Sequence, residues 1–352
     1  MSEAAGRLVY FENWADPVAE RILGERPEIG LVRLERASPE AENWAAMSQA
    51  HFYQIAPRTE LREPWFGDAP LLERCPHLLA ISSTGAGFDM VDVQACTAKG
   101  VIVCHQAGSN KEAVAEHALG FMIALSKRIA LSNRAMKKGA DLDRFAFTGN
   151  DLQGKTLGIV GIGHAGSRTT ELCKLALDME VLAYDPYLAA DEIARRGAAK
   201  IDELQELLRR SDFVSVHCPR TSETINMFGR GEFASMKPTA YFINTARGGI
   251  HNEAELVEAL AKRQIAGAAV DVFLQEPPPP DHPLLALDNV IATAHTAGIT
   301  EESLRAMASY AARQWIAIFE GRTPPRLVNP EAWPLYCERF ERLLGFRPTP
   351  LS

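Results

Sequence analysis

Short apolar runs alternate with polar or amphipathic segments through the first hundred residues. Five of these runs predict strands, at residues 8–11, 30–34, 52–55, 78–82 and 101–104. Strands that alternate with helical segments are typical of a parallel sheet with helices on both faces. The loops at 57–59 and 83–87 would then lie at carboxyl ends of strands, where open α/β sheets bind ligands.

A second alternating series follows a long helical pattern at 112–138. The apolar positions of that pattern repeat near the helical period: Val114, Ala118, Phe121, Met122, Leu125, Ile129 and Met136. We expect one helix, long enough to bridge two lobes. Six further strands are predicted at 156–160, 181–184, 213–216, 240–244, 266–270 and 289–293. Six parallel strands make a complete dinucleotide-binding sheet.

The end of the chain is apolar. A helix predicted at 302–320 has an apolar face, formed by Leu304, Met307, Ala311, Trp315, Ile318 and Phe319, and would return the chain to the first lobe. The tail at 329–352 carries Trp333, Leu335, Tyr336, Phe340, Leu343, Leu344 and Phe346. This is too apolar for a free terminus, so we expect it to pack on the first lobe, with a partner subunit as the alternative cover.

A glycine motif follows the first strand of the second series, in the stretch Leu157-Gly158-Ile159-Val160-Gly161-Ile162-Gly163-His164-Ala165-Gly166. In such a GxGxxG sequence the first glycine, Gly161, allows a tight turn, and Gly163 leaves room for a pyrophosphate. Gly166 lets the next helix pack close to the sheet. The helix N-terminus then offers N–H groups to the phosphates.

The elements after the motif complete a dinucleotide-binding unit. A helix is expected at 168–177 with Leu172, Leu175 and Ala176 toward the core, and the next strand ends in Asp185, 19 residues after Gly166. An acid at about this spacing accepts hydrogen bonds from the adenosine ribose and repels a 2′-phosphate. Because Pro186 and Tyr187 supply no neighbouring cation, the sequence favours NAD over NADP.

The composition limits the classes of partner and the cellular compartment that we expect. At 352 residues the chain is long enough for two domains. A net charge of -8 gives no reason to expect a nucleic acid or an anionic membrane as partner. The six cysteines form no CxxC pair, which suggests neither a metal site nor a disulfide framework. Without a signal-peptide pattern or a run of about 18 apolar residues, we expect a cytoplasmic protein.

Seven separated motifs give the chain a family resemblance. They are Ser83-Thr84-Gly85-Ala86-Gly87-Phe88-Asp89, Val114-Ala115-Glu116-His117, the GxGxxG, Val216-His217-Cys218-Pro219 with Thr224, Asn244-Thr245-Ala246-Arg247-Gly248-Gly249, Asp271-Val272-Phe273 with Glu276-Pro277, and His295-Thr296-Ala297-Gly298. In these motifs and in their order, from about Arg58 to Asn329, the chain resembles the D-isomer-specific 2-hydroxyacid dehydrogenases.

The resemblance implies a fold and a function. The fold would be α/β, with two doubly wound parallel-sheet domains. An NAD-binding Rossmann domain (107–302) would be inserted into a discontinuous, flavodoxin-like substrate domain (1–106 and 303–352). The function would be hydride transfer between NAD and a small 2-hydroxy or 2-keto acid in the cleft between two lobes. The family also implies a homodimer, with the 112–138 helix commonly at the interface.

Three residues would carry the chemistry. The resemblance makes His295 the general acid and base, Glu276 the carboxylate that orients it and stabilises its imidazolium form, and Arg247 the cation for the substrate carboxylate. Thr84, Gly85 and Ala86 would bind substrate, the last two through backbone N–H groups. A phosphorylated substrate would need more cations, for which Arg58, Arg62, Arg74 and Lys111 are candidates by position alone.

The remaining residues would hold NAD. The resemblance assigns the nicotinamide carboxamide to Asp271, a phosphate to Thr224, and the adenosine ribose region to Cys218 and Pro219. His164, Ala165, Thr245, Ala246 and Gly298 complete the expected cofactor contacts. No catalytic role is given to His117, which is expected to pack or to form hydrogen bonds. Cys218 is expected to pack and not to act as a nucleophile.

The chain departs from the family pattern at a few positions, and the sequence leaves alternative functions to consider. Met90 stands where many members have asparagine, Ser167-Arg168 replaces a small apolar pair, and His164-Ala165 replaces a frequent arginine-containing pair. Formate dehydrogenases have glutamine where Glu276 stands, which disfavours that activity. The alternative from another class is an NAD(H)-sensing, corepressor-like binding protein, since such proteins keep the same three residues.

Overall fold

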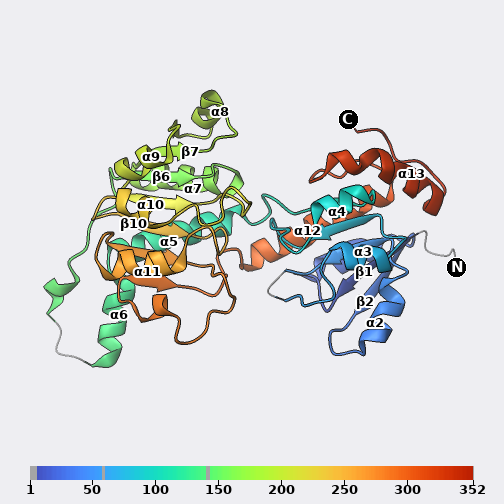
Figure 1. Ribbon diagram of the computed structural model, residues 1–352, viewed down its shortest axis with the longest axis horizontal. Coiled ribbons are helices and arrows are strands. Elements are labelled where there is room, and N and C mark those ends of the chain that lie inside the picture. Colours follow the sequence, from blue (N-terminus) through green and yellow to red (C-terminus); the bar gives the residue numbers. More distant parts are fainter. Residues whose placement is uncertain (1–5, 58–59, 140–142, 352) are drawn as a thin grey trace. The chain divides into compact units, whose positions relative to one another are not determined.

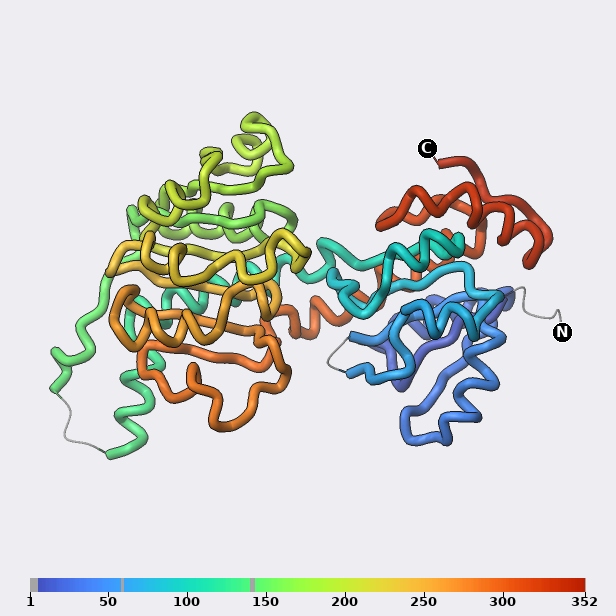
Figure 2. Tube along the Cα trace, viewed as in Figure 1, coloured from blue at the N-terminus to red at the C-terminus, as the bar shows by residue number. Residues whose placement is uncertain are grey.

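The computed structural model describes residues 6–57, 60–139 and 143–351. The chain forms two compact units: unit 1 is Met1–Asn110 with Thr300–Ser352, and unit 2 is Lys111–Ile299. Figure 2 shows the blue beginning and the red end of the chain in unit 1, and the green to orange middle in unit 2. One unit is therefore inserted into the sequence of the other.

Unit 1 is built on a five-stranded parallel sheet of order β2-β1-β3-β4-β5. Its strands are β1 (Gly6–Phe11), β2 (Ile29–Leu34), β3 (Phe52–Ile55), β4 (Ala80–Ser83) and β5 (Ile102–Cys104). Leu8 and Tyr10 enter the core on one face, and Val9 and Phe11 enter the core on the other. This two-sided burial explains the continuous apolar runs, and the strand order is flavodoxin-like, as predicted.

The helices of unit 1 lie on both faces of this sheet (Figure 1). They are α1 (Val18–Gly24), α2 (Glu40–Met47), α3 (Ala69–Arg74), α4 (Val93–Ala98), α12 (Glu301–Phe319) and α13 (Trp333–Leu344), with the 3₁₀ turn η3 (Pro330–Ala332). Helix α13 buries Trp333, Tyr336 and Phe340 in the cluster that contains Leu8 and Phe52. The apolar tail therefore packs on the unit that the sequence predicted.

Unit 2 carries a seven-stranded parallel sheet of order β12-β11-β10-β9-β6-β7-β8. Six strands were predicted: β6 (Thr156–Val160), β7 (Glu180–Tyr184), β9 (Phe213–Val216), β10 (Tyr241–Asn244), β11 (Gly267–Val270) and β12 (Val290–Ala292). The seventh, β8 (Ala199–Lys200), has two residues and is too short to leave an apolar pattern. From β8 the order is that of a Rossmann sheet with one strand added.

The helices of unit 2 also flank the sheet (Figure 1). They are α5 (Lys111–Ser126), α6 (Ile129–Lys138), α7 (His164–Leu177), α8 (Ala190–Arg195), α9 (Leu204–Arg210), α10 (Arg230–Ser235) and α11 (Glu253–Ala261), with the 3₁₀ turns η1 (Arg144–Phe147) and η2 (Pro283–Ala286). Among the described helices of both units, none is both long and apolar enough to cross a membrane.

The long helix predicted at 112–138 is two helices. Helix α5 ends at Ser126, and Arg128 adopts a left-handed φ of 53° before α6 begins. The Ser126 carbonyl accepts the N–H of Asn150 at 2.9 Å, so a distant loop takes the bond that would have continued the helix. No glycine or proline marks this break, and the periodic pattern concealed it.

The prediction that Leu172, Leu175 and Ala176 of α7 face the core is wrong. Leu175 is 77% exposed, and Leu172 is only partly buried, while the buried residues are Gly166, Thr169, Thr170 and Cys173. A helix that must lie close to a sheet presents its small side chains to it. The glycine motif therefore indicates the buried face better than the leucines do.

Candidate active site

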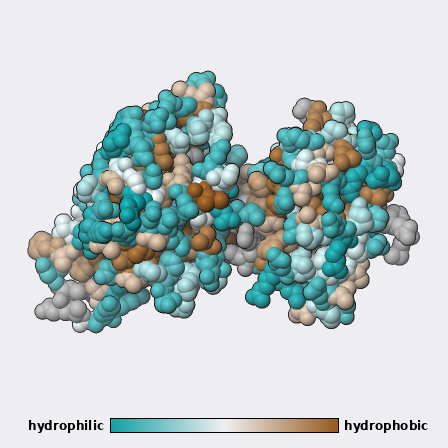
Figure 3. Space-filling view, in the orientation of Figure 1, coloured by the Kyte–Doolittle hydropathy of each residue, from teal (hydrophilic) through white to brown (hydrophobic). Residues whose placement is uncertain are grey.

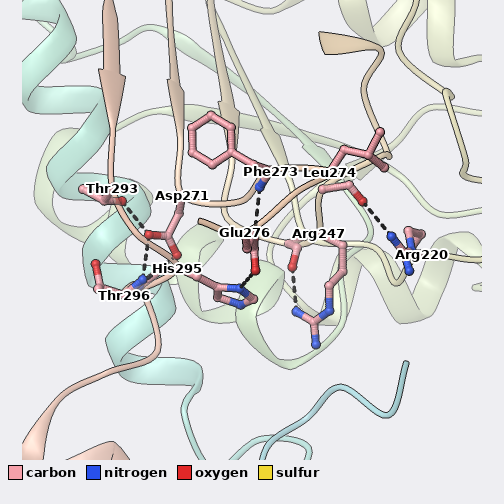
Figure 4. Close-up of polar contacts among 12 residues, drawn as sticks. Arg220, Arg247, Asp271, Phe273, Leu274, Glu276, Thr293, His295 and Thr296 are labelled. Atoms are coloured by element: carbon pink, nitrogen blue, oxygen red, sulfur yellow. Dashed lines mark hydrogen bonds and ion pairs between the residues drawn. The ribbon is translucent and has the colours of Figure 1, made fainter. Parts of the chain in front are cut away.

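Loops that follow β10, β11 and β12 bring the predicted catalytic residues together. These strands are neighbours in one parallel sheet, so their carboxyl ends meet at the same edge. Arg247 follows β10, Asp271 and Glu276 follow β11, and His295 follows β12. Figure 4 shows the side chains of Arg247, Glu276 and His295 gathered at this edge.

His295 and Glu276 form a close pair. The imidazole Nδ1 lies 2.7 Å from Glu276 Oε2, and the side chains are 35% and 19% exposed. Burial alone would raise the pKa of the Glu276 carboxyl. The hydrogen bond and charge of His295, the N–H of Phe273 at 3.0 Å and the charge of Arg247 outweigh it and lower that pKa below its ordinary value. Glu276 is therefore an anion at neutral pH, placed to stabilise an imidazolium.

Arg247 stands on a turn held by the buried Asn244. Asn244 accepts the Ala246 N–H at 2.9 Å and donates to the Arg247 carbonyl at 3.0 Å. The Arg247 guanidinium donates to the Ala246 carbonyl at 2.6 Å, and its charge reaches Glu276. Asn244 thus sets the backbone from which the guanidinium extends, a role that the sequence did not reveal.

The backbone of His295 is fixed by Asp271. His295 has a left-handed φ of 57°, and its N–H donates to the Asp271 carbonyl at 2.7 Å. The fully buried Asp271 carboxylate accepts the N–H groups of Thr296 at 2.8 Å and Ala297 at 2.9 Å, as well as the Thr293 hydroxyl. Asp271 therefore organises the 293–297 turn, which Gly298 follows.

The glycine motif has the geometry that a dinucleotide needs. Gly161 adopts φ +88°, and a Cβ there would lie 2.6 Å from the Cys218 nitrogen. A Cβ on Gly166 would lie 2.3 Å from the Gly161 carbonyl oxygen, whereas one on Gly163 would meet nothing within 4 Å. Helix α7 starts at His164, followed by Ala165, and its N-cap Gly163 makes no side-chain cap. The residues present thus fit a pyrophosphate at this terminus.

Asp185 lies at the end of β7 and is tied to the glycine motif. Its carboxylate accepts the N–H groups of Ile162 and Tyr187, each at 3.2 Å. Arg196, which the sequence reasoning did not consider, donates to the Ile162 carbonyl at 2.6 Å and pairs with Glu192 at 2.7 Å. Asp185 thus holds Ile162 through its N–H, and Arg196 holds it through its carbonyl.

The loop after β9 packs beneath the motif. Burial raises the pKa of the Cys218 thiol to about 11, which suits a packing residue and not a nucleophile. The Thr224 hydroxyl donates to the Pro219 carbonyl at 2.8 Å and closes the loop. In the described part of the chain, the buried Thr245 hydroxyl has no hydrogen-bond partner. An orphaned hydroxyl beside these loops fits a ligand that completes its bonding.

The predicted substrate loop belongs to unit 1. The Gly85 carbonyl accepts the Ser83 hydroxyl and the Gln106 N–H, both at 2.8 Å, and the Thr84 hydroxyl donates to the Ile55 carbonyl at 3.0 Å. His105 Nδ1 lies 3.2 Å from the Ala86 carbonyl. These bonds fix the orientation of the loop peptides.

The structure describes three of the four candidates for extra cations. Arg74 lies over the Trp44 ring at 3.4 Å, Arg62 is exposed, and Lys111 opens α5 in unit 2. Arg58 lies outside the described residues. Within the described ranges, no three His, Cys, Asp or Glu side chains gather as metal ligands.

Comparison with known proteins identifies the family. Residues 119–297, about half of the chain, match the profile of the D-isomer specific 2-hydroxyacid dehydrogenase, NAD binding domain. The chain belongs to this family. Unit 2 (Lys111–Ile299) therefore contains the nicotinamide-cofactor domain of this family.

Several D-2-hydroxyacid dehydrogenases are similar over most of the chain. A glyoxylate reductase of Thermofilum pendens is 39% identical over 75% of this chain and 78% of its own length. A D-3-phosphoglycerate dehydrogenase of Archaeoglobus fulgidus is 38% identical over 82% of this chain. The chain spans only 53% of that relative's length. The D-lactate dehydrogenase structure from Aquifex aeolicus, solved with NAD and lactic acid, matches with a TM-score of 0.76 at 27% identity. The match covers 91% of this chain and 98% of that chain.

The structure shows the surroundings of three residues that depart from the family pattern. Ser167 donates to the Ile162 carbonyl at 3.0 Å, so it adds a bond to the glycine motif. Arg168 pairs with Glu112 at 2.6 Å and joins α7 to α5. Met90 is buried in the core of unit 1. The side chains of Ser167 and Arg168 are thus both engaged in contacts within unit 2.

Proposed function

We propose that this protein interconverts a small D-2-hydroxy acid and its 2-keto acid, with NAD(H) as the hydride carrier. The observation that carries the proposal is the His295–Glu276 pair beside Arg247, at the strand ends of a nicotinamide-cofactor domain. Glyoxylate reductases and phosphoglycerate dehydrogenases are among the similar proteins, which supports a short 2-keto acid as substrate.

Each residue of the site has one task. In oxidation His295 takes the hydroxyl proton, and in reduction it returns that proton to the carbonyl oxygen. The Glu276 carboxylate stabilises the imidazolium form and holds the ring in place. Arg247 binds the substrate carboxylate with its planar fork, and we assign Thr84, Gly85 and Ala86 to substrate binding as well. A bound nicotinamide would supply or accept the hydride at C2.

We assign the cofactor to NAD. Asp185 would bind the adenosine ribose hydroxyls and repel a 2′-phosphate. Arg196 is already paired with Glu192, so it offers little charge to attract one. Gly161, Gly163, His164, Ala165 and Gly166 would hold the pyrophosphate. The other expected contacts are Cys218, Pro219, Thr224, Thr245, Ala246, Asp271 and Gly298.

A crossed panel of substrates and cofactors tests this function. Purified protein is given glyoxylate, hydroxypyruvate or phosphohydroxypyruvate with NADH or NADPH, and absorbance is followed at 340 nm. We expect turnover of at least one keto acid, with kcat/KM higher for NADH. Tight NADH binding without turnover of any 2-keto acid would favour the sensor function instead. A preference for NADPH would overturn the role of Asp185.

We also propose a cytoplasmic homodimer. All six cysteines are free thiols, which fits a reducing compartment. Helix α6 has no buried residue, and Ile129 and Met136 are 52% and 66% exposed. Apolar surface is visible over the α6 and η1 part of unit 2 (Figure 3). Light scattering should give twice the chain mass, and a monomer at micromolar concentration would contradict the dimer.

A further inference from the structure

A short chain of polar contacts leads from helix α5 to the turn that carries His295. His117 Nε2 lies 3.3 Å from the Thr293 hydroxyl oxygen and 4.0 Å from Asp271 Oδ1. The Thr293 hydroxyl donates to the same Asp271 oxygen. The His117 ring is half-buried and meets the Phe121 ring edge-on at 4.4 Å. The side chain is therefore held in place by packing as well as by its polar contacts.

Proton counting fixes the direction of this chain. Thr293 has a single hydroxyl proton, and Asp271 receives it. The contact between His117 and Thr293 therefore requires that Nε2 carries a proton and donates it. Burial lowers the pKa of His117, although the charge of Asp271 opposes this. The ring is thus a neutral Nε2–H tautomer at neutral pH, and the bonds run from His117 to Thr293 to Asp271.

The Asp271 carboxylate has few acceptor positions left. Oδ1 accepts the Thr293 hydroxyl and the Thr296 N–H, while Oδ2 accepts the Ala297 N–H. One lone pair of Oδ2 remains for a cofactor donor. The carbonyl of the same residue fixes the N–H of His295. The orientation of Asp271 thus governs both the free acceptor and the backbone of the general acid and base.

We propose that His117 and Thr293 are positioning residues of the reaction. They hold the Asp271 carboxylate in one orientation, and through it they hold the His295 imidazole against Glu276. Neither residue touches the reacting atoms. The proposal rests on the proposed function for its kinetic consequences, whereas its structural consequence, the geometry of the His295–Glu276 bond, is measurable without turnover.

Isosteric and conservative variants test the proposal as matched pairs. Thr293→Val removes the hydroxyl and keeps the shape, and Thr293→Ser keeps the hydroxyl. His117→Phe keeps the ring packing and loses the donor, and His117→Gln restores a donor near the Nε2 position. We expect kcat at saturating NADH to fall about tenfold in Thr293→Val and in His117→Phe, because small displacements of a catalytic group are costly. Thr293→Ser and His117→Gln should stay within about threefold of the wild type.

A spectroscopic readout separates positioning from general loss of stability. The proton between His295 Nδ1 and Glu276 Oε2 should give a strongly deshielded NMR signal, assigned by its loss in His295→Asn. We expect the signal to shift or broaden in Thr293→Val and His117→Phe and to return in the two conservative variants.

Two outcomes overturn the inference. One is an unchanged signal together with kcat within twofold of the wild type in both donor-lacking variants. The other is a loss that the conservative variants do not rescue, since this would make the role structural only. If the wild-type protein turns over no keto acid, the proposed function fails, and the NMR comparison still decides the positioning role.

Discussion

His295 is fixed at both its backbone and its ring, which is the strongest sign of a chemical role. A left-handed φ of 57° is uncommon for histidine, and it is maintained here by a 2.7 Å bond to the Asp271 carbonyl. A second 2.7 Å contact, to Glu276, orients the ring. Backbone strain of this kind persists where the surroundings over-determine it, and such positions cluster at active sites.

Replacing Glu276 by Gln tests the charge of its carboxylate. The amide oxygen can still accept the Nδ1 hydrogen bond, but it cannot stabilise an imidazolium by charge. We expect kcat to fall by about a hundredfold, within the range of a general acid and base contribution, while NADH affinity stays near that of the wild type. Steady-state kinetics and NADH fluorescence measure both quantities. A kcat within twofold of the wild type would remove Glu276 from the mechanism.

Arg247→Lys tests the need for a planar fork. Lysine keeps the positive charge but presents a point charge on a flexible stem. The KM for the 2-keto acid should rise at least about tenfold, since one of two hydrogen bonds to a carboxylate is lost. NADH affinity should not change. An unchanged KM would mean that the substrate carboxylate binds elsewhere.

At the level of single residues, the sequence indicated the candidate site residues but not the side chains that support them. Arg247, Glu276 and His295 stand in recognisable motifs, and the structure gathers them at one sheet edge. Asn244, Thr293 and Arg196 act by accepting or donating to neighbouring backbone or carboxylate groups. Such contacts depend on which loops meet in space, and no local spacing in the sequence records that.

Among the elements, the junction of β6 and α7 carries the cofactor prediction. Two glycines there play opposite parts. A Cβ on Gly166 would strike the backbone oxygen of Gly161 at 2.3 Å, and a Cβ on Gly163 would point into open space. Gly166 therefore serves packing, whereas we expect Gly163 to leave room for the ligand.

The pair Gly163→Ala and Gly166→Ala separates these parts. Gly163→Ala should fold with wild-type stability and raise the Kd for NADH at least about tenfold, because the methyl group occupies the path of the pyrophosphate. Gly166→Ala should destabilise unit 2 by about 1–3 kcal/mol, as overpacking does. NADH titration and urea unfolding give the two values. Wild-type NADH affinity in Gly163→Ala would refute the cofactor placement.

The strands were easier to predict than the helices. A strand buried on both faces leaves a short apolar run. All eleven described strands that exceed two residues, β1 through β7 and β9 through β12, begin and end within two residues of a predicted run. The residue at which a helix ends depends on which groups take the hydrogen bonds of its terminal backbone. The Ser126 carbonyl is taken by Asn150, which divides the predicted 112–138 helix. In α7 the small side chains are buried, although the larger leucines were predicted to face the core.

For the whole molecule, two histidines with a lowered pKa contribute to the loss of stability in acid. Burial lowers the pKa of His217 and of His251 to about 4 in the folded protein. An unfolded chain binds a proton at each histidine below about pH 6.5. Between these two values the unfolded state binds more protons, so acid favours unfolding. This contribution to stability is complete above the unfolded pKa of about 6.5 and is lost as the pH drops toward 4.

His217→Gln should flatten this dependence. Each buried histidine contributes a slope of about 1.4 kcal/mol per pH unit between about pH 6 and pH 4.5. The variant should lose one such contribution, and His251 should keep the other. Urea unfolding of both proteins at a series of pH values, followed by circular dichroism, gives the slopes. Parallel curves for the wild type and the variant would show that His217 is protonated in the folded state.

The most direct test of the account is the His295→Asn variant. Asparagine tolerates a left-handed backbone, so the turn is retained while the acid and base is removed. The account predicts that kcat/KM for the best 2-keto acid falls at least about a thousandfold, with the Kd for NADH within a few-fold of the wild type. Turnover by the variant within tenfold of the wild-type rate would contradict the assignment of His295, and with it the proposed mechanism.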